Sequence, residues 1–165
     1  MRQYEGREKE LKLNALLLND CFDEEWINQK NPINVYEFYG RVLDFTRSYH
    51  YDIVIGVTNT HHWFKEKYPN LKMIGYDENI SDYLPKHSNV LVAGAAWNAC
   101  LHKNAFCFQK LLEKSFNVYS HPKIVDSYMK STQIVNKEMF LADGWHPVNG
   151  LFLFHHYPET QNENE

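Results

Sequence analysis

The sequence has no apolar run long enough to cross a membrane, no glycine-rich phosphate loop and no stripe of basic residues. A membrane-spanning helix needs roughly 18 apolar residues in a row, and the first dozen residues here are charged, unlike a signal peptide. A net charge of -4 with scattered lysines does not favour binding to the phosphates of a nucleic acid. We therefore expect a cytoplasmic protein that acts on a small molecule, without nucleic-acid or membrane partners.

Cysteine is scarce as well. The three cysteines, Cys21, Cys100 and Cys107, lack the close spacing of a disulfide framework or a zinc site. Free thiols are expected, and most free thiols are small buried hydrophobic groups. Sequence context must therefore separate a reactive cysteine from a structural one.

The length of 165 residues, with 44% apolar and 23% charged residues, is typical of one soluble globular domain. We assign this domain to residues 1–157. Residues 158–165 are acidic and lack apolar side chains, which predicts a disordered tail.

Apolar patterning predicts an α/β fold in which strands alternate with helices. Strands are expected at 15–18, 52–58, 89–94 and 116–119, and helices at 35–49, 80–84 and 97–114. The segments 138–141 and 150–154 are interpreted as further strands or irregular edges. Strands joined through helices are normally parallel, so the central sheet should be mostly parallel.

Ligands of an open parallel sheet bind beyond the carboxyl ends of its strands. Three polar segments follow predicted strands: Asp20, the stretch 58–62, and the turn 94–100. Cys100 is expected in the first turn of a helix, where free N–H groups and the helix dipole favour a thiolate. Asp20 is the carboxylate we expect to accept the thiol proton. The alternative is that Cys100 and Asp20 have packing and capping roles.

Two stretches of sequence carry a family resemblance. Residues 16–20 read Leu-Leu-Leu-Asn-Asp, and residues 90–101 read Val-Leu-Val-Ala-Gly-Ala-Ala-Trp-Asn-Ala-Cys-Leu. This pattern resembles the isochorismatase-like superfamily of hydrolases, which includes nicotinamidases and related cysteine amidohydrolases. The first strand of that superfamily ends in an aspartate, and a later strand leads through glycine and five residues to the nucleophilic cysteine. The resemblance covers roughly residues 14–128.

The resemblance implies a three-layer α/β/α sandwich with a Rossmann-like topology. It also implies a catalytic triad of Asp20, Lys72 and Cys100, with the N–H groups of Ala96 and Cys100 as an oxyanion hole. Lys72 is the best match for the lysine of the family, although the pattern that normally follows this lysine is absent. Lys86 is too close to the next strand to take its place.

The resemblance implies that the protein requires no cofactor. Nicotinamidases carry a metal site that begins with Asp-Trp-His, whereas residues 58–63 here read Thr-Asn-Thr-His-His-Trp. The aspartate is missing and no clear third ligand follows, so we expect no metal site; His62 is the one candidate ligand if a divalent metal is bound. The motif at 143–147 lies in the wrong place for such a site, and the pair His155 and His156 is more simply read as having no metal role.

The leading hypothesis is a cysteine hydrolase of a small amide or related acyl compound, which would form a covalent acyl-enzyme. Phe22, Trp63 and Trp97 would line the substrate pocket. The alternative is a catalytically degenerate relative that binds a small ligand or a protein partner. A flavodoxin-like or nucleotide-binding scaffold is the third reading, and a homo-oligomer is compatible with all three.

Overall fold

The computed structural model describes residues 11–19, 32–57, 60–95, 101, 104–126 and 135–155. The strands are β1 (Ala15–Asn19), β2 (Ile53–Val57), β3 (Leu71–Ile74), β4 (Asn89–Ala95), β5 (Asn117–Ser120), β6 (Val125–Asp126), β7 (Trp145–Val148) and β8 (Leu151–Phe154). The α-helices are α3 (Pro32–Thr46), α4 (His62–Lys67), α6 (Phe108–Glu113) and α7 (Lys137–Ala142), and the short 3-10 helices are η1 (Ile80–Asp82) and η2 (Pro122–Ile124).

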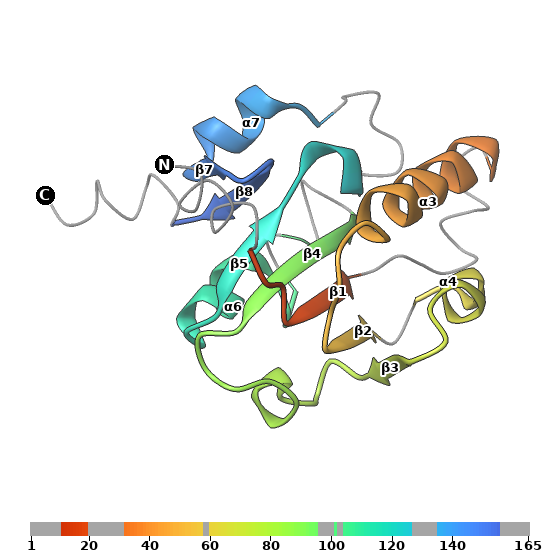
Figure 1. The fold of residues 1–165 in the computed structure, drawn as a ribbon, viewed down its shortest axis with the longest axis horizontal. Helices are drawn as coiled ribbons and strands as arrows, with labels where there is room; N and C mark the ends of the chain where they lie inside the picture. The colour runs from red at the N-terminus through yellow and green to blue at the C-terminus, as the bar shows by residue number, and fades with distance from the viewer. Residues whose placement is uncertain are drawn as a thin grey trace, which may run out of the picture.

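The strands form one open mixed sheet in the order β3-β2-β1-β4-β5-β8-β7, with β6 paired to β4 (Figure 1). The pairs that link β3, β2, β1, β4 and β5 are all parallel, whereas β8 is antiparallel to both β5 and β7. The prediction of an α/β fold with a mostly parallel sheet is confirmed. The antiparallel hairpin at one side of the sheet was not predicted.

Both faces of β1 are buried, because successive residues of a strand point to opposite faces. Ala15 and Leu17 belong to one core cluster, which contains side chains of α6 and α7. Leu16 and Leu18 belong to a second cluster, with side chains of α3 and α4. All four side chains are fully buried, and burial of each leucine contributes about 1.5–3 kcal/mol. This continuous apolar run therefore packs against both core clusters, one on each face of the sheet.

On the side of β4 that faces away from β1, the neighbouring strand changes along the length of β4. Its first half pairs with β5, from Asn89 to Leu91, and its last two residues pair with β6. Between these two ladders the Ser120 hydroxyl donates a hydrogen bond of 2.7 Å to the carbonyl oxygen of Val92. The chain thus leaves β4 after β5, turns through η2 and returns to the carboxyl end of β4.

Two predictions of local structure are wrong. The single helix expected over 97–114 is not continuous: Leu101 is helical, but residues 104–107 form a turn and an extended cap before α6 begins. Cys107 therefore occupies the N-cap position of α6, without a side-chain capping hydrogen bond, instead of lying within a helix. It is buried, as most free cysteines are. The segment 138–141, interpreted as a strand or irregular edge, lies in α7.

The strands expected at 52–58, 89–94, 116–119 and 150–154 correspond to β2, β4, β5 and β8, and the helix expected at 35–49 corresponds to α3. The expected helical stretch at 80–84 is the short η1. The elements β3, β7 and α4 were not predicted. In the described ranges, none of the helices is long and apolar enough to cross a membrane.

Candidate functional site

The strand order reverses between β1 and β4, because the chain adds β2 and β3 on one side of β1 before β4 pairs on the other. Such a reversal is where open α/β sheets bind ligands, beyond the carboxyl ends of the strands. Asn19 is the last residue of β1 and lies in register with Gly94 of β4. The predicted site residues Asp20, Phe22, Ala96, Trp97 and Cys100 lie outside the described residues.

Gly94 lets the carboxyl ends of β1 and β4 approach each other closely. Its φ of +141° is one that other residues rarely adopt, and a Cβ atom there would lie 1.9 Å from the carbonyl oxygen of Asn19. A side chain at position 94 would therefore push the two strand ends apart. Gly94 therefore has a steric function at this edge of the sheet.

The side chain of Asn19 is fully buried and has hydrogen-bond partners for both ends of its amide. Its Nδ2 donates to Asn104 Oδ1 and to the carbonyl oxygen of Phe106, both at 3.2 Å. Its Oδ1 accepts a hydrogen bond of 2.7 Å from Asn104 Nδ2. The backbone N–H of Phe106 also donates to Asn104 Oδ1, at 2.9 Å. The end of β1 is thus tied to the segment that follows Leu101.

The other flank of β4 is formed by β6, where Asp126 lies in register with Ala95. The chain enters this flank through η2, which His121 caps by accepting the N–H of Lys123 on its Nδ1. The His121 ring packs 4.6 Å from the ring of Phe45, between centroids. Burial and the nearby Lys123 ammonium lower the pKa of His121, so its neutral form is favoured.

Polar residues at the carboxyl end of β2 stabilise local structure. The N–H and the hydroxyl of Thr60 both donate to the carbonyl oxygen of Val57, at 2.7 Å. His61 is buried and caps α4, because its Nδ1 accepts the N–H of Trp63 at 3.1 Å. Nδ1 of His61 is therefore occupied and not available to a metal. Thr58 and Asn59 lie outside the described residues.

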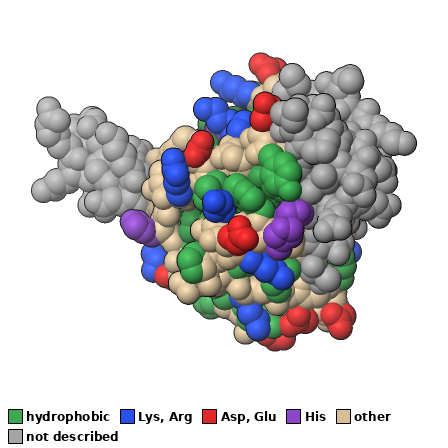
Figure 2. Space-filling view, turned by 90° about the vertical axis from the view of Figure 1, so that its right-hand side faces the viewer, with side chains coloured by type: hydrophobic (Ala, Val, Ile, Leu, Met, Phe, Trp, Pro, Cys, Tyr) green, Lys and Arg blue, Asp and Glu red, His purple; other side chains and the backbone are tan. Residues whose placement is uncertain are grey.

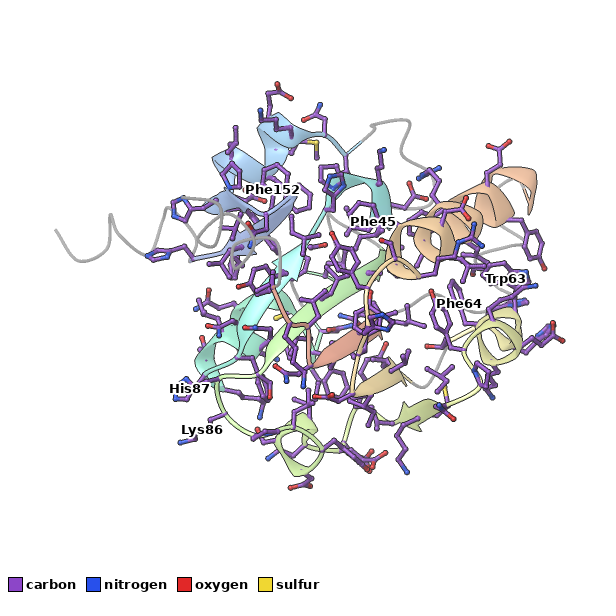
Figure 3. The ribbon with its side chains drawn as sticks, viewed as in Figure 1. Phe45, Trp63, Phe64, Lys86, His87 and Phe152 are labelled. Atoms are coloured by element: carbon purple, nitrogen blue, oxygen red, sulfur yellow. The ribbon has the colours of Figure 1, made fainter. Side chains whose placement is uncertain are left out.

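Trp63 lies at the start of α4, on the side of the molecule where α3 also begins (Figures 1 and 3). His62 is the first residue of α4. The half-buried Trp63 ring packs 5.7 Å from the Tyr39 ring of α3, and the Lys67 ammonium lies 5.5 Å from its centroid. His62 is exposed and stacks on His61, with centroids 4.1 Å apart. Figure 2 shows this side of the molecule, where exposed hydrophobic side chains are surrounded by charged and histidine side chains.

Lys72 lies on β3, in register with Ile55 and hence two residues before the end of β1. Its side chain is exposed, and its ammonium lies 5.5 Å from the centroid of the Tyr83 ring. The Tyr83 hydroxyl donates to Glu78, and the Gly75 N–H donates to the same carboxylate. These hydrogen bonds, with Lys72 nearby, lower the pKa of Glu78. Lys72 therefore belongs to a charged surface cluster in the described structure.

Lys86 precedes β4 and lies far from α4, next to His87 (Figure 3). This position is at the amino end of β4, opposite the edge where Asn19 and Gly94 meet.

Among the described side chains, no group of three or more His, Cys, Asp and Glu residues could hold a metal ion. His62 accordingly belongs to no such group within that part of the chain.

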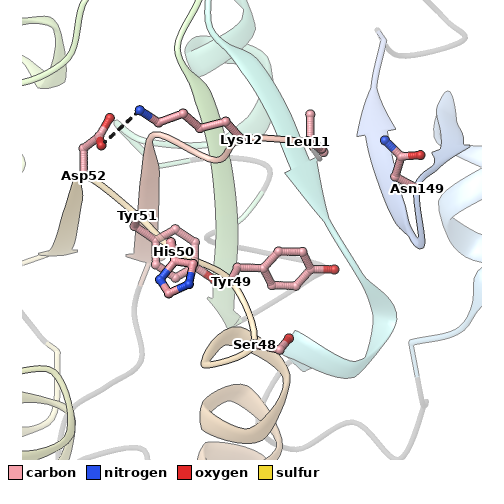
Figure 4. Close-up of a pocket in the computed structure, with 8 residues that line it drawn as sticks. All are labelled: Leu11, Lys12, Ser48, Tyr49, His50, Tyr51, Asp52 and Asn149. Atoms are coloured by element: carbon pink, nitrogen blue, oxygen red, sulfur yellow. Dashed lines mark ion pairs between the residues drawn. The ribbon is translucent and has the colours of Figure 1, made fainter. Parts of the chain in front are cut away.

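The amino edge of the sheet has a hollow of about 560 Å³ (Figure 4). Its lining residues are Leu11, Lys12, Ser48, Tyr49, His50, Tyr51, Asp52 and Asn149. Lys12 and Asp52 form an ion pair of 3.4 Å across it, and Asn14 Nδ2 donates to the same carboxylate. These contacts, the Asn14 hydrogen bond first, lower the pKa of Asp52. No thiol lies among the lining residues, so this hollow does not supply the predicted chemistry.

Three residues of the carboxyl edge were given no role in the predictions from the sequence: Asn19, Asn104 and Asp126. The available signal for Asn19 was an amide at the end of a strand that is otherwise entirely apolar. Asn104 had a weaker signal, because it interrupts the apolar face of the helix expected there.

No protein-family model, curated protein or solved structure matches this chain.

Proposed function

We propose that this chain is an isochorismatase-like cysteine hydrolase that cleaves a small amide or related acyl compound. The observation that carries the proposal is the reversal of strand order between β1 and β4. Asp20 directly follows the end of β1, and Ala96 directly follows the end of β4. The motif residues thus continue from the two neighbouring strand ends where open α/β sheets bind ligands.

The described surroundings of Cys100 also support the proposal. Leu101, the next residue in the chain, is helical and fully buried in the core cluster on the α6 side of the sheet. Gly94 holds the preceding strand close to β1. A cysteine at the start of a helix is a favourable position for a thiolate. The overall architecture we propose is the three-layer α/β/α sandwich of that superfamily.

The reaction would begin when Asp20 accepts the proton of the Cys100 thiol. The thiolate attacks the amide carbonyl and forms a C–S bond, while the N–H groups of Ala96 and Cys100 stabilise the oxyanion. Asp20 then returns its proton to the nitrogen as the C–N bond breaks and the amine leaves. Water then attacks the thioester while Asp20 takes its proton. The C–S bond breaks, the carboxylic acid leaves, and Asp20 returns the proton to the Cys100 thiolate.

The substrate would lie against an aromatic wall of Phe22, Trp63 and Trp97. Of these, Trp63 has a described ring that is half-buried and close to Tyr39. Lys72 is the proposed electrostatic partner of Asp20 and Cys100. For this role its ammonium has to leave the Tyr83 ring, which its exposed side chain allows.

A second candidate function is ligand or partner binding by a catalytically degenerate relative. The contact of Lys72 with Tyr83 favours this alternative, because a lysine held there does not support a triad. The two candidates differ in one measurable property, the reactivity of the Cys100 thiol.

The test is the pH dependence of alkylation by iodoacetamide in the wild type and in Asp20→Ala, with mass spectrometry to locate the modified cysteine. A hydrolase should show a Cys100 pKa well below about 8.5 that changes when Asp20 is removed. Cys107 is an internal reference, because its side chain is buried and should react slowly. An ordinary Cys100 pKa that is indifferent to Asp20 contradicts the proposed hydrolase and favours the binding protein.

A further inference from the structure

Asn19 and Asn104 form a reciprocal amide pair inside the carboxyl edge of the sheet. Each side chain donates to the Oδ1 atom of the other, at 3.2 Å and 2.7 Å. The second hydrogen of Asn19 Nδ2 goes to the carbonyl oxygen of Phe106. Asn19 therefore uses both of its donors and its acceptor although its side chain is fully buried. The arrangement needs an amide at position 19.

Neither a carboxylate nor an apolar side chain could replace the Asn19 amide without loss. An aspartate would place an acceptor against the Phe106 carbonyl oxygen, and a leucine would remove the hydrogen bonds that Asn19 makes with the Asn104 side chain and the Phe106 carbonyl oxygen. Buried polar groups that lose their partners are costly. The main chain of Asn19 is constrained as well, because it lies directly against Gly94. The end of β1 is thus held from two directions.

The two asparagines lie next to the two residues that the proposed reaction uses. Asn19 is bonded to Asp20, and Asn104 follows Cys100 by four residues. Leu101, between Cys100 and Asn104, is fully buried. A pair of planar amides with two opposed hydrogen bonds has one relative orientation, so it fixes two chain segments that are 85 residues apart.

We propose that Asn19 and Asn104 are positioning residues that hold Asp20 and Cys100 at the separation needed for proton transfer. This inference rests on the proposed hydrolase function. Proton transfer between two side chains requires hydrogen-bond distance, and displacements of about 1 Å cost large factors in rate. Release of the amide pair should therefore weaken the coupling of the Cys100 thiol to Asp20.

The main variant is Asn104→Ser, assayed by the pH dependence of Cys100 alkylation with iodoacetamide. A serine hydroxyl can still accept the Phe106 N–H in a local turn, but it is too short to pair with Asn19. We expect the Cys100 pKa to move by about one unit from the wild-type value toward the value it has in Asp20→Ala. A shift of one unit changes the alkylation rate about tenfold at pH values below both pKa values. Asn104→Ala should give the same shift, with an additional loss of melting temperature because the turn is also lost.

The matched control is Asn117→Ala at the amino edge of the sheet. Asn117 Nδ2 donates to Asn89 Oδ1 at 3.0 Å and to the carbonyl oxygen of His87 at 3.2 Å, the same two acceptor types that Asn19 Nδ2 has. This variant should leave the Cys100 pKa unchanged. A purely structural role of the pair would lower the melting temperature without moving the thiol pKa.

A double-mutant cycle with Asp20→Ala separates positioning from a general effect on the thiol. If Asn104 acts through the pairing of Asp20 with Cys100, Asn104→Ser should have little further effect on the Cys100 pKa once Asp20 is removed. A low, Asp20-dependent Cys100 pKa that persists in folded Asn104→Ser and Asn104→Ala overturns the positioning role alone. An ordinary Cys100 pKa in the wild type overturns the hydrolase and the positioning role together.

Discussion

Two asparagines bracket β1, and they differ in what surrounds them. Asn14, before the strand, is half-buried, and its side chain pairs with the N–H of Asn89 and with the exposed carboxylate of Asp52. Asn19, at the other end, is fully buried and pairs with Asn104 and Phe106. The same residue type therefore joins chain segments at both edges, but solvent can replace lost hydrogen bonds at one edge only.

This difference in burial indicates that the side chains at the carboxyl edge of the sheet have one fixed geometry, whereas those at the amino edge can adopt several. At the amino edge, the main chain also contributes, because the N–H of Asn14 donates to the Asn89 carbonyl oxygen at 2.8 Å. At the carboxyl edge, an amide pair and a close main-chain contact hold the strand end. A buried polar network that is fully paired specifies one geometry, whereas an exposed one tolerates several.

The largest expected effect comes from Gly94→Ala. The added Cβ atom would lie 1.9 Å from the Asn19 carbonyl oxygen, and the φ of +141° is unfavourable for alanine. We expect a loss of about 4 kcal/mol or more in the free energy of unfolding, measured by urea denaturation, or failure to fold.

The control for Gly94→Ala is Gly40→Ala, in the interior of α3. No atom lies within 4 Å of a Cβ built at Gly40, and alanine is a better helix former than glycine by about 0.5–1 kcal/mol. This substitution should stabilise the protein. A mild effect of Gly94→Ala, similar in size to that of Gly40→Ala, contradicts the close approach of β1 and β4.

The second largest effect is expected from replacing the two asparagines that bracket β1. Asn19→Ala removes a fully buried amide that makes three hydrogen bonds and should lower the free energy of unfolding by about 2–3 kcal/mol. Asn14→Ala should cost about 1 kcal/mol, since water can reach the groups it leaves. Urea denaturation of both variants measures the difference, provided that the free energy of unfolding has the same dependence on urea concentration in each. Equal losses of free energy would show that burial does not distinguish the two edges.

The smallest expected effect is a pH dependence centred on His121. Burial and Lys123 lower its pKa in the folded protein, whereas the unfolded value is about 6.5. The unfolded chain therefore binds more protons just below pH 6.5, and the stabilisation present above that pH is lost as the pH falls. The free energy of unfolding should decrease between about pH 7.5 and 5.5.

His121→Asn tests the origin of this pH dependence. Asparagine does not titrate, and its Oδ1 can still cap η2 by accepting the N–H of Lys123. The variant should lose part of the decrease in stability between the two pH values. An unchanged pH dependence would mean that other groups cause it.

The parts of the fold that were predicted are those with strong local patterns. The run Leu16–Leu18 and the β-branched segment of β2 indicate buried parallel strands without reference to the rest of the chain. The short β3 and β7 lack such patterns: Lys72 is exposed on one, and β7 contains His146 and Pro147. Their strand geometry comes from pairing with neighbours, which periodicity does not report.

The broken helix before α6 has a similar cause. The apolar spacing over 97–114 is helical, and Leu101 and Phe108 of its predicted core face are buried. The turn at Asn104 depends on Asn19, a partner 85 residues away, so no local pattern reveals it. The candidate site was located from strand ends and motif residues, while the groups that hold those strand ends together required the structure. Asp20 and Cys100 remain predictions.

The two strands at the outer limits of the described sheet, β3 and β7, also bear on how copies of the chain could assemble. An unpaired strand edge can recruit a strand from another molecule, and natural proteins oppose this with lysine or proline. Lys72 is exposed on β3, and Pro147 on β7 has no N–H to offer to a further strand. Joining two sheets side by side is therefore disfavoured at both limits of the described sheet.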